Sequence, residues 1–344
     1  MCTEGSSMRT GTKQLRMGAS LAVCAAIAAA LIAANSVSGG ATQASPDPAL
    51  LDALPSGEST LVYLDLAAVR GSSFYQHRPD KGPITVPNPD YADFIRSTGF
   101  DFEKDLDRAA IAIWPAPAGK SRSVAIAEGR FDQAKIRDYA ARQGRIDHQR
   151  GREVFLFPTG AQGNWTSAFF LDEHRLVLVS GQSIDPLFAA HTTDSVVDPI
   201  RERASRLDGA AAFAISHVPP TPDDPADGAL QGGPNSQLMA LARSVRWITL
   251  ALRPEGDDLR VSLEGECNNG EDARELQSAL EVLRAFGRMG LDSPKTRQSM
   301  SPAALASLQS VLKSAEVTQT AERVRVLVEL TPDIFKAGDA SKPN

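Results

Sequence analysis

Cysteine is scarce in this 344-residue sequence, which holds only three. Cys2 and Cys24 fall within the first 44 residues, so Cys267 stands alone in the rest of the chain. One cysteine cannot form an internal disulfide, which excludes a disulfide-based scaffold. Cys267 ends the predicted strand 264–267 among acidic neighbours, which disfavour a thiolate, so we interpret it as a partly buried structural residue rather than a reactive thiol.

Motifs of catalysis and metal binding are also missing. The five histidines are spread singly, without the HxH, HxxxH or HExxH spacing of a local metal site. Neither G-x-S-x-G nor G-x-G-x-x-G occurs, and Ser310 with Lys313 fits S-x-x-K without its partner motifs S-D-N and K-T-G. The acidic segment 223–228 resembles part of a calcium loop that would end at Pro234 instead of Glu. We therefore predict no catalytic residue, cofactor or metal, although a site assembled from distant residues stays open.

Positive charge is in deficit, with 36 basic against 42 acidic side chains and a net charge of −6. The first 44 residues hold Arg9, Lys13 and Arg16 against Glu4, so the remaining chain carries 33 basic and 41 acidic side chains, a balance of −8. The lysines and arginines are scattered along an acidic chain and do not form the basic patch that would neutralise the phosphates of a nucleic acid. This excludes a nucleic-acid partner. The same balance disfavours attraction of the folded part to anionic lipid.

An export signal is the clearest feature that is present. Residues 1–16 are polar and basic, residues 17–34 are uncharged and apolar, and small residues dominate 35–45. This three-part order is typical of a secretion signal. Small residues at 34–36 and 42–44 offer cleavage sites, whereas an 18-residue apolar run is also long enough for an uncleaved anchor. We predict an exported protein in the periplasm or cell envelope, with anchoring in the inner membrane through 17–34 as the alternative to cleavage.

Hydrophobic periodicity in the body predicts strands and helices. Apolar and polar residues alternate over 259–264 and 323–330, as in strands with one face in the core and one in water. Apolar residues recur at helical spacing over 271–288 and 302–313, and Asp132 is placed to cap a helix through Arg142. This pattern predicts an α+β fold of antiparallel sheets with helices packed on one face.

The order of elements indicates two similar halves. The segments SVAIAEGRFDQAKIRDY and RVSLEGECNNGEDAREL share a strand, a Glu-Gly pair, a cap and a helix. We predict an export signal or anchor over 1–44, α+β halves over 45–206 and 207–337, and a disordered tail over 338–344. An internal duplication and a chance match of strand–helix junctions both explain the likeness.

The body also resembles a group of poorly characterised bacterial exported proteins. The matching segments are STLVYLDLAAV after Leu54-Pro55, TGFDFEKDLDRAAIAI, VAIAEGRFDQAKI, and GREVFLFP with SAFFLDEHRLVLVSG, followed by the closing hairpin and helix. The likeness covers most of 53–335 and consists of strand starts and turns. It implies a fold and no catalytic residues.

Three functional classes follow from these features. The first is a non-enzymatic envelope protein that acts as an interaction or scaffold module for another protein. The second is a periplasmic carrier that binds an apolar small molecule or lipid between sheet and helices. The third, an enzyme, is the least favoured. The residues expected to face such a ligand are Leu276, Leu280, Leu283, Leu308 and Leu312.

Overall fold

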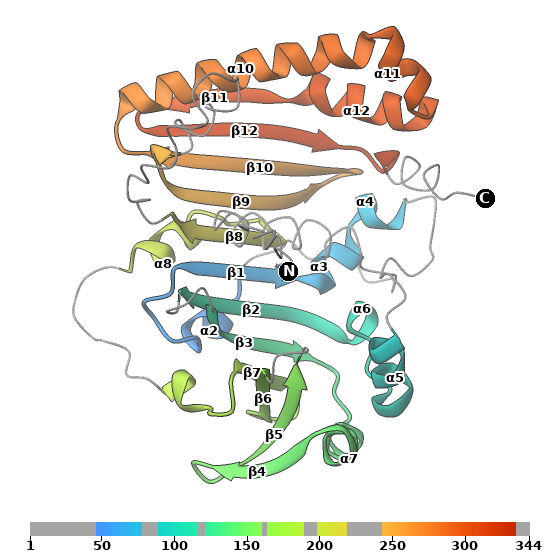
Figure 1. Cartoon of the computed structure of the whole chain (residues 1–344), viewed down its shortest axis with the longest axis vertical. Helices are drawn as coiled ribbons and strands as arrows, with labels where there is room; N and C mark the ends of the chain where they lie inside the picture. Colours follow the sequence, from blue (N-terminus) through green and yellow to red (C-terminus); the bar gives the residue numbers. More distant parts are fainter. Residues whose placement is uncertain are drawn as a thin grey trace, which may run out of the picture.

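The described part of the chain forms one large antiparallel sheet. The computed structural model describes residues 46–77, 89–115, 121–159, 164–188, 198–218 and 243–334. The sheet order is β11-β12-β10-β9-β8-β1-β2-β3-β7-β6-β5-β4, and Figure 1 shows it extending along the long axis of the molecule. The twelve strands are β1 (Thr60–Asp65), β2 (Leu106–Pro115), β3 (Ser121–Gly129), β4 (Arg145–Gln149), β5 (Arg152–Thr159), β6 (Asn164–Phe170), β7 (Arg175–Ser180), β8 (Ala212–His217), β9 (Val245–Glu255), β10 (Asp258–Cys267), β11 (Glu316–Thr320) and β12 (Arg323–Leu330).

Helices connect the strands and cover the sheet. The predicted α+β class with an antiparallel sheet is confirmed. The predicted helix after Asp132 is present as α7, because the Asp132 carboxylate accepts a hydrogen bond from the Lys135 amide at 3.1 Å. The helices are α2 (Pro48–Asp52), α3 (Leu66–Gly71), α4 (Ser73–Gln76), α5 (Pro89–Thr98), α6 (Phe102–Asp105), α7 (Gln133–Gln143), η2 (Asp185–Phe188), α8 (Pro199–Ala204), α10 (Gly270–Asp292), α11 (Pro294–Ser299) and α12 (Pro302–Ser314).

The β9–β10 hairpin illustrates how local sequence sets the register. Its turn places Gly256 at a φ of 59°, a left-handed conformation that glycine adopts without a Cβ clash. β10 pairs with β9 along one edge and with β12 along the other. Val261 of β10 lies opposite Val328 of β12, and Leu263 lies opposite Val326, so apolar residues of β9, β10 and β12 share one face of the sheet. The alternation seen in the sequence is therefore the alternation of the two faces.

The two predicted halves are joined within the sheet. β8 pairs with β1 along the register from Leu64↔Ala212 to Thr60↔Ser216, and the hydroxyls of Thr60 and Ser216 lie 2.8 Å apart. In each half three neighbouring strands precede a helix, and the last strand of the half lies beside the third. The halves differ in that four strands, β4 to β7, follow the helix in the first and two, β11 and β12, follow it in the second. The boundary predicted between residues 206 and 207 falls in the connection between α8 and β8, and the hydrogen-bonded sheet continues across the two segments.

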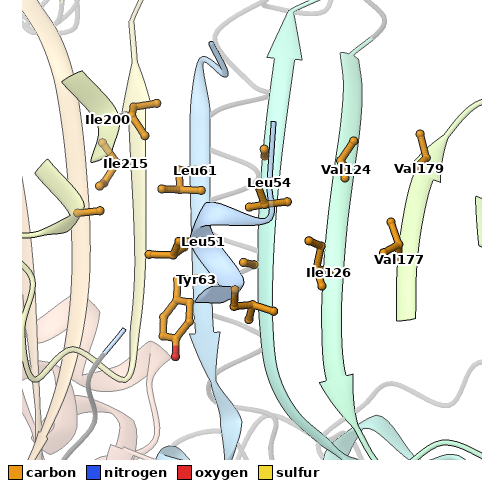
Figure 2. Packing of buried hydrophobic residues seen from close by; sticks show 14 of the residues in the cluster. Leu51, Leu54, Leu61, Tyr63, Val124, Ile126, Val177, Val179, Ile200 and Ile215 are labelled. Carbon is orange, nitrogen blue, oxygen red and sulfur yellow. The ribbon is translucent and has the colours of Figure 1, made fainter. Parts of the chain in front are cut away.

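One face of the sheet is covered by short helices. Leu61 and Tyr63 of β1 belong to a buried cluster that continues over β2, β3, β7 and β8. Figure 2 shows Leu51 of α2 and Leu54, which follows the helix, over these strands, and Ile200 of α8 beside β8. Helices thus cover this face as well as the opposite one, where the long predicted helices lie.

The opposite face carries α3, α4, α7 and the C-terminal helices. Val62, which alternates with Leu61 and Tyr63, packs with residues of α3 and α4, whereas Ile136 and Ala140 of α7 cover the β5–β6 region. α10 packs at the other end, over β10, β11 and β12. The predicted export segment 1–44 and the predicted tail 338–344 lie outside the described residues, and both remain predictions.

Candidate functional site

The C-terminal helices form a hairpin whose ends are fixed by side-chain caps. The carboxamide oxygen of Asn269 accepts from the amides of Glu271 and Asp272, both at 2.9 Å, and starts the 23-residue α10. Ser293 caps α11 and Ser301 caps α12 in the same way. We call α10, α11 and α12 together the helical hairpin.

The inward face of α10 attaches the helical hairpin to the sheet. Ala273 is fully buried in a cluster that includes Val324 of β12, and Leu276, Leu280 and Val317 of β11 pack against this cluster. These two leucines, predicted to face a ligand, contact the protein's own core side chains. Cys267 belongs to this cluster, and burial raises the pKa of its thiol, which keeps it in the neutral form.

Two arginines fix the rotation of α10 relative to α12. The Arg284 guanidinium donates to the carbonyl of Ala315 at 2.5 Å. The Arg288 guanidinium donates to the carbonyl of Leu312 at 2.9 Å from one nitrogen and 3.2 Å from another. Leu312 packs closely on α10 as well, because a Cβ built at Gly287 would lie 3.2 Å from its Cδ1. The polar side of α10 is thus directed at α12.

The face of α10 opposite these contacts is apolar and exposed. Val282, Leu283, Phe286 and Met289 have exposed fractions between 46% and 62%. Val282, Phe286 and Met289 recur at i, i+4 and i+7 on the side of the helix away from Leu280. Leu283 lies beside Phe286, at the edge of this side that is nearer Leu280. We call these four residues the outward apolar face. Amphipathic surface helices normally place charged residues on the side away from the core, and these four apolar residues depart from that pattern.

The predicted ligand-facing residues are thus divided among three environments. Leu276 and Leu280 pack in the core, Leu312 packs between α12 and α10, and Leu283 and Leu308 are exposed. Sequence reasoning missed Val282, Phe286 and Met289. The signal was present, because from Ala279 to Leu291 the apolar residues are spread around the whole helix instead of along a single stripe.

Polar clusters elsewhere are explained by ion pairing. A shallow hollow is lined by Asp107, Glu128, 172–174 and Arg175. Within it the Arg175 guanidinium donates to the Asp172 carboxylate at 2.6 Å, and this hydrogen bond lowers the pKa of Asp172. Asp107 similarly pairs with Arg70 at 2.6 Å. Asp107, Glu128 and Asp172 of the hollow are thus paired with arginines, and its lining residues do not include a nucleophile next to a base.

Metal-binding groups and membrane-spanning helices are absent from the described residues. In the ranges given above, no three His, Cys, Asp or Glu side chains are grouped so that they could hold a metal ion. None of the helices described is both long enough and apolar enough to cross a membrane. The apolar segment 17–34 lies outside these ranges.

Comparison with known proteins gives no family. No family model matches the chain, and no curated protein matches it. Among solved structures, crystal form I of TP0453 has a TM-score of 0.44 at 10% identity, covering 86% of this chain and 98% of that chain. Crystal form IV has a TM-score of 0.44 at 11% identity, with 87% and 98% covered. At this degree of similarity no activity, ligand or partner can be transferred.

Proposed function

We propose that the protein is an exported, non-enzymatic envelope component that acts as an interaction module through the outward apolar face of α10. The exposure of Val282, Leu283, Phe286 and Met289 carries this proposal. Exposing apolar side chains to water is unfavourable, and the largest apolar patch on a protein surface is often functional. The order of basic, apolar and small residues over 1–45 supports export. The likeness to bacterial exported proteins agrees with this location.

The arrangement of contacts supports an interaction surface better than an accident of packing. Arg284 and Arg288 hold α10 by hydrogen bonds to carbonyls near the end of α12, and Leu276 and Leu280 hold it by packing. Rotating the helix to bury the outward apolar face would break both sets of contacts. The helix is therefore fixed with its apolar side in solvent, as a preformed binding surface requires.

A carrier is the alternative, and one exposed side chain favours it. Leu263 of β10 is exposed, although it lies on the same sheet face as Gly265, whose Cβ position contacts the side chain of Leu276. An apolar ligand beside α10 would cover Leu263. Leu276 and Leu280, however, already pack on protein side chains, which reduces the space between sheet and helix.

Oxidation of Met289 tests whether the outward apolar face is covered in the envelope. In the isolated protein, exposed Met289 is expected to oxidise faster than half-buried Met300. In intact envelope preparations, oxidation of Met289 should slow markedly while that of Met300 changes little. Peptide mass spectrometry measures both rates in the same sample.

A matched pair of variants controls this measurement. Phe286→Ser removes the most exposed apolar side chain of the face and should restore Met289 oxidation in the envelope. Phe188→Ser changes the exposed phenylalanine of η2 and should leave the protection intact. Equal Met289 oxidation rates in the envelope and in the isolated protein would rule out the proposed function.

A further inference from the structure

The helix that carries the outward apolar face, α10, lies at one end of the molecule. Figure 1 shows α10 along the rim of the molecule beyond β11 and β12, at one end of the long axis. Val282 and Met289 are seven residues apart, which corresponds to about 10 Å along the helix axis. The exposed apolar side chains therefore form a short strip along α10.

The area of this strip is small for a protein interface. Its four side chains expose roughly 400 Å² in total, against about 800 Å² on each partner of a standard stable interface. A second copy of this chain, packed on the strip alone, would bury too little surface for a stable dimer. Shallow insertion into a lipid headgroup region needs only the apolar side of one helix.

The charge of the helical hairpin differs in sign from that of the whole chain. The whole helical hairpin, residues 270–314, holds six basic and five acidic side chains, a net charge of +1. Its part 281–314, which contains the outward apolar face, holds five basic and two acidic side chains, a net charge of +3, whereas the chain as a whole carries −6. The two acidic residues of 281–314 are paired, Glu281 with Arg284 at 2.7 Å and Asp292 with Arg297 at 3.3 Å. Lys295 and Lys313 are both exposed. Since charges more than about 8 Å away are largely screened at physiological salt, a docked surface senses this local positive charge first.

We propose that the helical hairpin binds an anionic phospholipid surface, with α10 in the plane of the interface and Val282, Phe286 and Met289 inserted at the headgroup level. An apolar helix face combined with nearby lysine and arginine is the chemistry that recognises such a surface. This inference rests on the proposed function and names the partner of the same surface. The overall charge predicts repulsion from anionic lipid, but the local charge at the contact predicts attraction.

An environment-sensitive dye at position 286 tests the contact in the full chain. Phe286→Cys, combined with Cys2→Ser and Cys24→Ser, gives one accessible thiol, because Cys267 is fully buried and its thiol pKa is raised by burial. The matched control carries the dye at Phe188→Cys. The predicted apolar segment 17–34 is the same in both proteins, so vesicle binding through it is common to both.

The expected result is a blue shift at position 286, and none at position 188, on vesicles of equal parts phosphatidylglycerol and phosphatidylcholine. The shift should be much smaller on pure phosphatidylcholine. Lys295→Gln and Lys313→Gln should each weaken the response to anionic vesicles about fivefold, the effect of one basic residue near an anionic surface. These exposed lysines lie outside the outward apolar face, so both variants keep it unchanged.

An unchanged emission at position 286 with anionic vesicles, or an equal shift on both vesicle types, would overturn the lipid proposal. A blue shift that grows with protein concentration without vesicles would show that a second copy covers the face. That outcome overturns the lipid partner and leaves the proposed function standing. The proposed function fails separately, if Met289 oxidises as fast in the envelope as in the isolated protein.

Discussion

Replacing Arg201 with Met is expected to lower the free energy of unfolding by about 3 kcal/mol at neutral pH, because it leaves a buried carboxylate without its cation. The Glu58 side chain is fully buried, and Arg201 of α8 lies 3.1 Å from its Oε1. This contact is an ion pair without the geometry of a hydrogen bond. Removing one partner of a buried ion pair usually costs about 3–5 kcal/mol of stability. We expect a loss at the lower end of this range, because the Arg201 side chain is 22% exposed and partly solvated.

The pH dependence of this variant follows from the pKa of Glu58. Burial raises the pKa of the Glu58 carboxyl above its ordinary value of 4.5, and Arg201 partly offsets the increase. Because the pKa is higher in the folded than in the unfolded state, this carboxyl stabilises the folded state below pH 4.5. The stabilisation is lost as the pH rises through the folded-state pKa. Without Arg201 the pKa rises further, so the defect should be largest at neutral pH and shrink near pH 4.5.

Urea unfolding at the two pH values measures this effect. The double variant Glu58→Gln with Arg201→Met removes the charge together with its partner and should recover much of the lost stability. Arg201 also donates to the carbonyl of Leu51 at 2.7 Å, and the loss of that hydrogen bond will persist in both variants. A loss that is below about 1 kcal/mol, as for an exposed ion pair, or that is independent of pH would contradict this account.

Phe213→Ala is expected to destabilise the whole sheet by about 3–5 kcal/mol, the usual cost of deleting a buried phenylalanine side chain. Phe213 lies on β8 directly opposite Tyr63 of β1, and the two rings stack with centroids 5.4 Å apart and planes at 23°. Both side chains are completely buried in the cluster that extends from β8 across β1 and β2 to β7. The variant would therefore leave a cavity at the place where the two predicted halves meet.

The form of the unfolding transition distinguishes one cooperative unit from two. We expect amide exchange in β3 and in β10 to report the same loss of stability in Phe213→Ala, because the hydrogen-bonded sheet is continuous between them. Phe188→Ala, which changes an exposed phenylalanine, is the control and should cost much less. Loss of protection in one half at a lower urea concentration than in the other would show that the halves unfold independently.

Local sequence patterns predicted many of the helices and strands, but little of how the strands pair in the sheet. The alternation over 323–330 and the helical spacing over 302–313 predicted β12 and α12 closely. The β8–β1 pairing could not be predicted, because a period of two selects the face of a strand and not its neighbour in the sheet. The hydrogen bonds of that pairing join residues more than 140 positions apart in the chain.

The candidate site was missed for a related reason. Apolar residues surround α10 beyond Ala279, so periodicity gives two possible inward faces. The choice between them is made by tertiary contacts, above all the hydrogen bonds of Arg284 and Arg288 to carbonyls of Ala315 and Leu312. Leu283, predicted to face inward, is therefore exposed beside Phe286.

Photocrosslinking from position 286 in living cells tests the central claim most directly, that the outward apolar face is a contact surface. Phe286 would be replaced by p-benzoylphenylalanine, with the same replacement at Phe188 as the control, since both side chains are exposed. The account predicts a phospholipid adduct at position 286, identified by mass spectrometry, and no comparable adduct at position 188. Absence of any adduct at position 286 in cells, with the full chain present and folded, would contradict it.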